Sequence, residues 1–171
     1  MENFHKIESS QLSKDAITLI GKDWMLISAS KDGVANTMTA AWGGLGYLWN
    51  KPVAFLFIRP QRYTKEFVEA SDALSLTFFD EEHRETLRYL GRVSGKDEDK
   101  IKKVNFHTKW HNEIPYFEEA TITIFATKLY KQEIDPACFI DQKIIDERYP
   151  LRDFHTVYVV EIDEIYARDD A

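Results

Sequence analysis

Two short segments carry residue types that could hold a ligand with a planar polar ring and an anionic tail. Residues 36–42 read Asn-Thr-Met-Thr-Ala-Ala-Trp, which mixes short hydrogen-bonding side chains with small and apolar ones. Residues 59–64 read Arg-Pro-Gln-Arg-Tyr-Thr. Guanidinium groups bind phosphate oxygens through paired N–H donors. A helix that starts at Thr64 would add free backbone N–H groups and the positive end of its dipole.

Flavin mononucleotide (FMN) is a ligand of this shape. Its phosphate needs cationic donors, which residues 59–64 offer, and its ring needs edge contacts and an apolar wall, which residues 36–42 offer. Each segment also has a plainer interpretation. The arginines suit a solvated pair at the end of a strand, and residues 36–42 suit a second hairpin strand packed on a neighbour.

The elements that must position these segments are mainly strands. Residues 53–58 are apolar throughout, which predicts a strand buried on both faces. Lys31-Asp32-Gly33 predicts a hairpin turn. Further strands are expected over residues 24–30, 34–42, 74–79, 121–130 and 155–165. Three glycines at 43, 44 and 46 are expected to interrupt regular structure.

Helices are expected over residues 9–20, 64–70, 80–90 and 97–104, and from Asp135 to before Tyr149. Residues 105–118 are predicted to be a loop with covering aromatic side chains, and residues 167–171 a polar tail. Strands outnumber helices and do not alternate regularly with them. The sequence therefore predicts a mainly β fold, an antiparallel β-barrel with peripheral helices, in a single domain spanning residues 1–171.

Composition excludes several classes of function. The 171 residues include 22 basic and 29 acidic side chains, for a net charge of −7, and no extended basic run, so we expect no nucleic-acid partner. The longest apolar run has six residues, too short to span a bilayer. Cys138 is the one cysteine and is expected in the core. We therefore expect a soluble, cytoplasmic protein without a membrane partner.

Histidines give little support for a metal site. His107 and His111 have the i, i+4 spacing that two ligands use on one helix face. However, Pro115 and the neighbouring aromatics argue against a helix there, and no glutamate follows His107. His155 stands alone far along the chain. We therefore expect no bound metal.

Four segments together resemble the flavin reductase-like family, and more closely its flavoredoxin-type members. Residues 36–42 and 59–64 are the first two. Residues 93–100 resemble the family's Ser-Gly…Asp-Lys segment, and residues 153–162 resemble its Asp-His-x-x-x-x-Gly-Glu-Val strand, with Val160 in place of the glycine. The resemblance implies an FMN-binding split barrel of antiparallel Greek-key type, usually a homodimer with FMN near the subunit interface.

The resemblance also implies roles for individual residues. Residues 36–42 would lie along the isoalloxazine ring and ribityl chain, and Lys100 would contact the phosphate or ribityl chain. His155 would lie near the flavin or nicotinamide side of the pocket. No catalytic side chain is required, because the cofactors perform hydride transfer. The predicted cofactor-binding residues are Asn36, Thr37, Met38, Thr39, Ala40, Trp42, Arg59, Gln61, Arg62, Tyr63, Thr64 and Lys100.

Three functions stay open at this point. The first is an oxidoreductase that uses NADH or NADPH to reduce flavin, or a small-molecule or protein acceptor, through bound FMN. The second is a flavoredoxin-like electron carrier that exchanges electrons with protein partners and uses no nicotinamide. The third is a split-barrel protein whose cofactor site has decayed, which the intact residues 59–64 disfavour. The sequence decides neither the nicotinamide nor the final electron acceptor.

Overall fold

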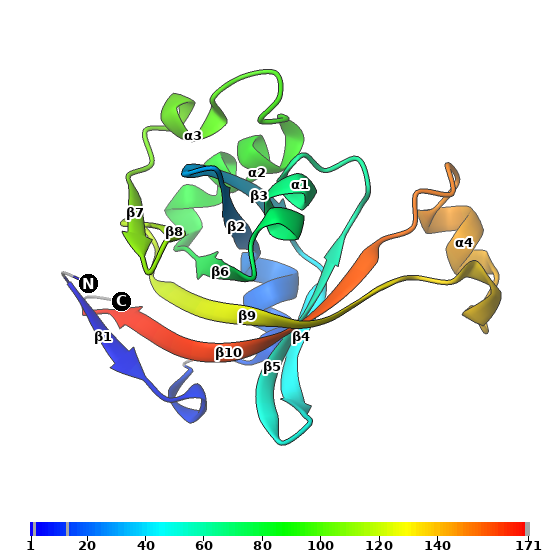
Figure 1. The fold of residues 1–171 in the computed structure, drawn as a ribbon, viewed down its shortest axis with the longest axis horizontal. Coiled ribbons are helices and arrows are strands. Elements are labelled where there is room, and N and C mark those ends of the chain that lie inside the picture. Colours follow the sequence, from blue (N-terminus) through cyan, green and yellow to red (C-terminus); the bar gives the residue numbers. More distant parts are fainter. Residues whose placement is uncertain (2, 13, 170–171) are drawn as a thin grey trace.

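Eight strands form one antiparallel sheet in the computed structural model, which describes residues 1, 3–12 and 14–169 (Figure 1). The strand order is β3-β2-β6-β9-β10-β5-β4, and β1 pairs with β10. The strands are β1 (Phe4–Ile7), β2 (Met25–Lys31), β3 (Val34–Ala40), β4 (Gly43–Leu48), β5 (Lys51–Ile58), β6 (Ala73–Phe78), β9 (Ile122–Glu133) and β10 (Thr156–Arg168). Neighbours distant in sequence, such as β5 and β10, give the predicted Greek-key connections.

The sheet is rolled into an open barrel. Its two edges are β3 and β4, yet only Ala41 and Trp42 separate these strands in the chain. Three residue steps span at most roughly 10 Å, so the two edges must lie close together. The strands at this seam do not pair, which leaves the barrel split beside residues 36–42.

Tight turns join neighbouring strands and fix their register. The predicted hairpin between β2 and β3 is confirmed, with Asp32 (φ 52°) and Gly33 (φ 76°) at its turn. Positive φ at both positions matches the twist of the flanking strands. Trp49 and Asn50 turn the β4–β5 hairpin in the same way, with φ of 54° and 59°.

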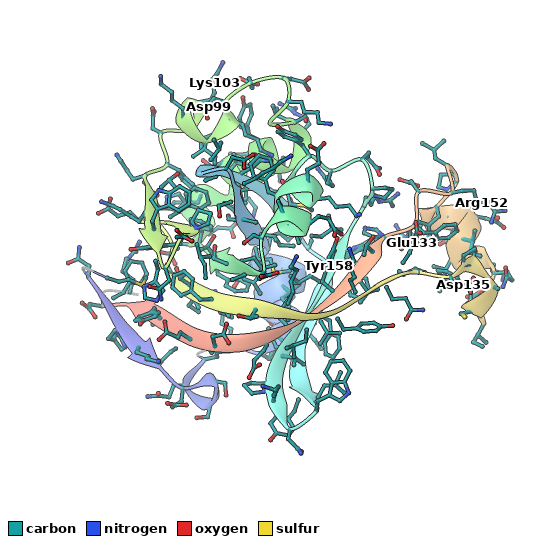
Figure 2. The ribbon with its side chains drawn as sticks, viewed as in Figure 1. Asp99, Lys103, Glu133, Asp135, Arg152 and Tyr158 are labelled. Atoms are coloured by element: carbon teal, nitrogen blue, oxygen red, sulfur yellow. The ribbon has the colours of Figure 1, made fainter. Side chains whose placement is uncertain are left out.

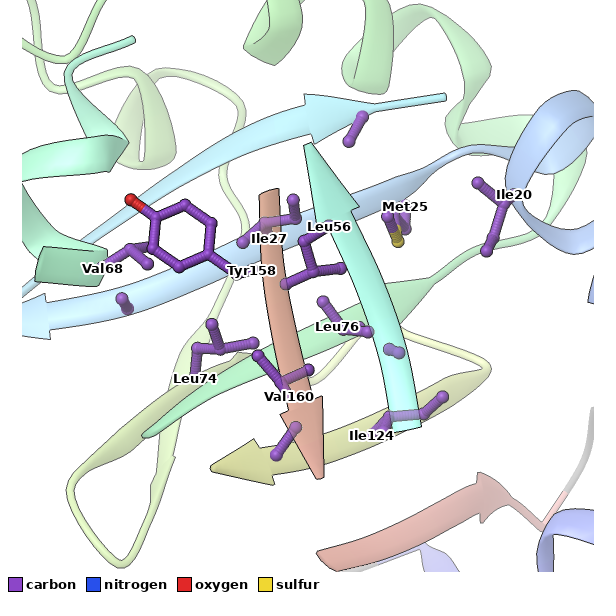
Figure 3. Packing of buried hydrophobic residues seen from close by; sticks show 14 of the residues in the cluster. Ile20, Met25, Ile27, Leu56, Val68, Leu74, Leu76, Ile124, Tyr158 and Val160 are labelled. Carbon is purple, nitrogen blue, oxygen red and sulfur yellow. The ribbon is translucent and has the colours of Figure 1, made fainter. Parts of the chain in front are cut away.

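The main core lies inside the barrel (Figure 3). Tyr158 and Val160 of β10 face Leu56 of β5 and Ile124 of β9, and all four are fully buried. The Tyr158 hydroxyl donates a hydrogen bond to the Glu69 carboxylate at the rim of this core. The prediction that β5 is buried on both faces is only half right, because Phe55 and Phe57 on its other face are partly exposed.

Helices cover the body of the barrel: α1 (Thr64–Ala70), α2 (Arg84–Arg92) and α3 (Lys100–Lys103). Thr64 is the first residue of α1, as predicted, but the N-cap is Tyr63, and no side chain caps the helix. The expected helix over residues 9–20 is wrong. A 3₁₀-helix (Ser9–Gln11) and a π-helix (Ile17–Asp23) stand there instead.

An arm, residues 134–155, projects from the body where β9 and β10 run past the sheet (Figure 1). It holds a 3₁₀-helix (Pro136–Cys138) and α4 (Lys143–Arg148), in place of the one helix expected. Figure 2 shows Asp135 and Arg152 out on the arm, whereas Tyr158 lies in the body. The arm has its own small core of Ile145, Tyr149 and Phe154.

Three further predictions are corrected by the structure. The glycines at 43, 44 and 46 lie in β4, because a Cβ at Gly43 would stand 2.7 Å from the Phe55 carbonyl oxygen, so glycine permits that close pairing. Residues 105–118 include a hairpin, β7 (Thr108–His111) and β8 (Ile114–Phe117), rather than a plain loop. Cys138 is exposed on the arm and does not lie in the core.

β10 extends into the segment that was predicted to be a polar tail. Residues 167 and 168 belong to β10, whereas 170 and 171 lie outside the described residues. His107 and His111 each contact a carboxylate, of Glu119 and Glu164 respectively. The described residues hold no group of three or more potential metal ligands. No helix among them is long and apolar enough to cross a membrane.

Candidate functional site

A cavity of about 350 Å³ lies at the barrel seam, where β3, the β3–β4 link, the end of β5 and α2 meet the base of the arm. We call it the first cavity. Its walls combine aromatic, small and cationic side chains. They are Trp24, Met38, Thr39, Ala40, Ala41, Trp42, Phe57, Arg59, Arg62, Leu87, Arg88, Gly91 and His155.

Helix α2 closes one side of the first cavity because it packs tightly on β3. Leu87 and Leu90 are buried in a second core, and the Thr39 hydroxyl donates a 2.5 Å hydrogen bond to the Leu87 carbonyl. A Cβ at Gly91 would lie 3.0 Å from Cβ of Thr39. Glycine at this position therefore allows the close approach of α2 to β3. The predicted helix ends at residue 90, whereas α2 continues through Gly91 to Arg92.

Two cations, the partly buried Arg62 and the buried Lys100, stand at the C-terminal end of α2. Arg62 donates to the Gly91 carbonyl, and the Lys100 ammonium donates to the carbonyls of Leu90 (2.7 Å) and Val93 (2.9 Å). The negative end of a helix dipole favours cations at this position. Within the described residues neither cation contacts a carboxylate, so the charge of the pair is only partly balanced.

Burial and neighbouring positive charge lower the pKa values of both cations. Lys100 is 3% exposed, and burial together with the nearby Arg62 lowers its pKa to about 8. Burial and the charge of Arg59 lower the pKa of Arg62 as well. A site with surplus positive charge and little water is suited to an anion.

Arg59 is held differently. Its guanidinium pairs with the Asp153 carboxylate, donates to the Arg148 carbonyl at 2.8 Å, and lies 5.1 Å from the ring centre of Tyr149. Gln61 donates to the same carboxylate at 2.7 Å. These hydrogen bonds lower the pKa of Asp153. Arg59 and Gln61 therefore fasten the base of the arm to the end of β5.

His155 lines the first cavity from the arm side. It is 6% exposed, and its ring centre lies 5.1 Å from that of Trp42 and 6.4 Å from that of Phe57. Burial lowers its pKa to about 4, and the charges of Arg59 and Arg62 add to that effect. The imidazole is therefore neutral near pH 7, and it offers hydrogen bonds rather than charge.

A second cavity, of about 580 Å³, contains other predicted residues: Asn36, Tyr63 and Lys100. The Asn36 amide donates a 3.2 Å hydrogen bond to the Thr64 hydroxyl, and both residues are buried. A Cβ at Gly95 would lie 2.6 Å from the Asn36 side-chain oxygen. Only glycine lets the segment before α3 come this close to β3, which gives the Ser-Gly part of residues 93–100 a structural reason.

The predicted residues therefore separate into groups. Met38, Thr39, Ala40, Trp42, Arg59, Arg62 and His155 line the first cavity, and Asn36, Tyr63 and Lys100 line the second. Thr37, Gln61 and Thr64 line neither. The Thr37 hydroxyl is fully buried, accepts from Ser28 at 2.8 Å and donates to the Ile27 carbonyl at 3.1 Å. The cofactor-binding roles of the whole set stay predictions.

Sequence reasoning missed the α2 side of the first cavity, which is formed by Leu87, Arg88 and Gly91. It also missed Trp24, whose ring lies 4.4 Å from the guanidinium of Arg84. The available signals were the leucine pattern of α2 and a glycine within it. Neither pattern says that the helix packs over β3.

Comparisons with known proteins agree with this architecture. A family model described as "Flavin reductase like domain" matches residues 19–171. An FMN-binding domain of a flavin reductases-like enzyme from Shewanella baltica is 16% identical, with TM-score 0.70 over 97% of this chain and 78% of that chain. A flavoredoxin from Methanosarcina acetivorans is 19% identical, with TM-score 0.69 over 96% and 75%.

An NADH:FAD oxidoreductase from Streptomyces globisporus, solved with NAD and FAD fragments, is 12% identical. Its TM-score is 0.64 over 87% of this chain and 76% of that chain. A Shewanella frigidimarina protein described as having a split barrel domain also matches, with TM-score 0.67. At these identities the likeness shows the fold, which confirms the predicted split barrel. No curated protein matches the chain significantly.

Proposed function

The chain belongs to the flavin reductase like domain family, and we propose that it is an FMN-binding oxidoreductase that uses NADH or NADPH to reduce flavin or another acceptor. The observation that carries this proposal is the cation pair of Arg62 and Lys100, which donates to backbone carbonyls and contacts no carboxylate among the described residues. Arg62 lines the aromatic first cavity, and Lys100 lines the second. That combination fits a ligand with a flat ring and a phosphate.

The residues present fit FMN by their chemistry. Arg62 and Lys100 can turn from backbone carbonyls to phosphate oxygens, which are stronger acceptors for a cationic donor. Trp42 and Phe57 provide aromatic faces for the ring, and the small side chains of Ala40 and Ala41 leave the backbone within reach of its edge. Asn36, which lines the second cavity together with Lys100, already shares a hydrogen bond with Thr64, and both can serve the ribityl and phosphate end.

The chemistry that bound FMN would supply is hydride acceptance and onward electron transfer. The chain would contribute binding, orientation and exclusion of water. Met38 and Ala40 are 4% and 8% exposed and belong to the main core, so the β3 wall of the first cavity is backed by packed apolar side chains. Holding two rings against each other in a fixed orientation removes much of the entropic cost of bringing them together. The neutral His155 would act as a hydrogen-bonding wall rather than as a charge.

A flavoredoxin-like electron carrier is the second candidate. Flavoredoxins from Methanosarcina acetivorans and Desulfovibrio vulgaris each match 96% of this chain, with TM-scores of 0.69 and 0.67. Every residue assigned above would serve this function equally, since only the electron donor differs. A carrier would bind FMN and exchange electrons with proteins, without using a nicotinamide.

We also propose a cytoplasmic homodimer, in agreement with the family resemblance. Exposed aromatics support a protein–protein contact: Tyr47 is 72% exposed and Trp49 is 55% exposed at the tip of the β4–β5 hairpin. The Trp49 ring contacts that of Tyr130 on β9, with centres 6.3 Å apart. Sedimentation equilibrium would test the proposal, and a monomer at all concentrations would contradict it.

Anaerobic reduction separates the two functional candidates. Purified protein is loaded with FMN and mixed with NADH or with NADPH in the absence of oxygen, while absorbance near 450 nm is followed. Rapid bleaching with either nucleotide is the expected result for a reductase. Protein that binds FMN but is bleached by neither nucleotide is the carrier, and protein that takes up no FMN contradicts both proposals.

A further inference from the structure

The hydroxyl of Tyr149 and the imidazole of His155 form a buried pair where the arm joins the first cavity. Tyr149 directly follows α4, and its hydroxyl oxygen lies 2.9 Å from Nδ1 of His155. Both residues are buried, with exposed fractions of 5% and 6%. The contact determines which ring nitrogen of His155 remains for a ligand.

The Tyr149 hydroxyl is the donor in this hydrogen bond. A neutral imidazole has one N–H donor and one acceptor nitrogen, and a phenol has a single hydrogen to donate. If Nδ1 carried the proton, the Tyr149 hydrogen would need another acceptor, and the described residues provide none. A buried donor without an acceptor is costly. Donation from Tyr149 to Nδ1 satisfies both groups and places the histidine proton on Nε2.

Both partners are neutral near pH 7, so the hydrogen bond from Tyr149 selects between the two neutral tautomers of His155. Burial lowers the pKa of His155 to about 4, and Arg59 and Arg62 outweigh the opposing charge of Asp153. Burial likewise raises the pKa of Tyr149. One proton therefore resides on each group across the physiological range.

The pair is held in a fixed place. The His155 ring lies against Trp42 and Phe57, with centres 5.1 and 6.4 Å away. The Arg59 guanidinium covers the Tyr149 ring at 5.1 Å and is itself tied to the arm by a carboxylate. A donor whose position is set by packing costs little further ordering when a ligand arrives.

We propose that Tyr149 is a positioning residue that holds His155 as its Nε2–H tautomer, so that His155 donates a hydrogen bond to a carbonyl oxygen of the ligand in the first cavity. The inference rests on the proposed flavin site and adds to it a hydrogen-bond donor that recognises a carbonyl group. A neutral N–H suits a neutral acceptor, whereas an anionic group is drawn to Arg62 and Lys100. The carbonyl can belong to the flavin ring or to a nicotinamide carboxamide.

Nuclear magnetic resonance of the full chain, labelled with ¹⁵N at histidine, tests the tautomer directly. His155 is assigned by the signal lost in His155→Gln. Without ligand we expect the Nε2-protonated pattern for His155, and Tyr149→Phe should convert it to a mixture of tautomers. Tyr166→Phe is the matched control, because its hydroxyl bonds Glu164 at 3.4 Å instead. That variant should leave the His155 pattern unchanged.

Ligands then test the donor role. A shift of the Nε2–H signal on addition of FMN identifies a flavin carbonyl, and a shift only on further addition of NAD⁺ identifies the carboxamide. An Nδ1–H pattern in the wild type, or an unchanged pattern in Tyr149→Phe, would overturn the positioning role. A signal that moves with neither ligand would overturn the donor role. Absorbance titration separately reports whether FMN binds, which tests the proposed function itself.

Discussion

Arg59 and Arg62 lie three positions apart after the same strand, yet their surroundings differ. Arg59 contacts a carboxylate, a carbonyl and an aromatic ring, all on the arm. Among the described residues, the Arg62 guanidinium donates to the Gly91 carbonyl and pairs with no carboxylate, and Arg62 lies close enough to Lys100 to lower the pKa of the lysine. The first arginine is electrically balanced by the protein itself. The second retains charge that a ligand can use.

This difference shows what residue type and spacing leave undecided. Both arginines match the expected phosphate pattern, and both line the first cavity. The carboxylate that engages Arg59 comes from Asp153, 94 positions along the chain. A cation that already has a carboxylate partner must break that pair to bind phosphate, whereas Arg62 gives up only a carbonyl. We therefore expect the phosphate to depend on Arg62.

The largest expected effect comes from removing that charge. Arg62→Ala should weaken FMN binding by about 10- to 150-fold, because a hydrogen bond to a charged group contributes roughly 1.5–3 kcal/mol. Arg59→Ala should weaken it distinctly less. Fluorescence titration of each variant with FMN measures the two affinities. Equal losses in the two variants would contradict the distinction between them.

Riboflavin, which has the ring and no phosphate, is the control for this comparison. Its affinity should change little in Arg62→Ala if the guanidinium acts on the phosphate. A parallel loss for riboflavin and FMN would instead show that the substitution disturbs α2, whose last turn Arg62 contacts. Adding Thr64→Ala to Arg62→Ala should deepen the loss for FMN alone. An unchanged FMN affinity in the double variant would reject the phosphate assignment.

Local patterns predicted much of the fold. The turn at Asp32 and Gly33 and the span of α1 follow from turn chemistry and hydrophobic spacing, and both are confirmed. β5 is a strand as predicted, although Phe55 and Phe57 leave one of its faces partly exposed. The prediction that the glycines at 43, 44 and 46 interrupt regular structure was wrong, because it relied on the usual tendency of glycine to weaken a strand. Here the Phe55 carbonyl oxygen lies so close that only glycine fits.

The site was less predictable because its contacts join distant residues. Nothing near Lys100 in the sequence says that its ammonium is buried against two carbonyls at the end of α2. The hairpin of β7 and β8 was not predicted, because its aromatic residues do not alternate clearly with polar ones in the sequence. Whether a side chain already has a hydrogen-bonding or charged partner within the protein therefore distinguishes the structural residues from the candidate ligand-binding residues.

Lys100 should make the affinity for FMN depend on pH. Its pKa of about 8 in the free protein would rise when a phosphate dianion binds beside it. FMN binding then takes up a proton above pH 8, so affinity should fall by up to about tenfold per pH unit as pH rises from 8. The phosphate is already a dianion there, with its second pKa near 6. Titrations at pH 7, 8 and 9 measure this slope.

Two controls belong with the pH series. Riboflavin should show no slope, because it has no phosphate to pair with Lys100. Lys100→Met should bind FMN weakly at every pH and lose the slope. A slope of the same size for riboflavin would assign the pH dependence to another group and remove Lys100 from the phosphate site.

Asp153→Asn should make Arg59 behave more like Arg62. The arm loses its anchoring charge. The Ile134 amide donates a 2.9 Å hydrogen bond to the His155 carbonyl at the base of the arm. Hydrogen exchange of this amide should accelerate by up to about fivefold, which corresponds to the loss of a partly exposed ion pair. Barrel amides such as that of Leu56 are the internal control. Equal acceleration in both places would mean global destabilisation instead.

The wild-type protein should show the same change in acid. Arg59 and Gln61 hold the pKa of Asp153 below its usual value, so the folded arm favours the ionised carboxylate. This contribution is fully present above the unfolded pKa of about 4 and is lost as pH falls through the lowered value. Arm exchange, corrected for its intrinsic pH dependence, should therefore rise in that range in the wild type and not in Asp153→Asn.

Thr37 extends the comparison to a neutral side chain that is already satisfied. Its hydroxyl accepts from Ser28 and donates to the Ile27 carbonyl inside the core. Thr37→Val should leave FMN affinity unchanged and lower stability by about 1–3 kcal/mol, because the Ser28 hydroxyl loses its buried acceptor. Thr37→Ser keeps the hydroxyl and should keep most of that stability. Weakened FMN binding in a folded Thr37→Val protein would show that a side chain with internal hydrogen-bond partners still contacts the ligand. Internal partners would then no longer distinguish structural residues from ligand-binding residues.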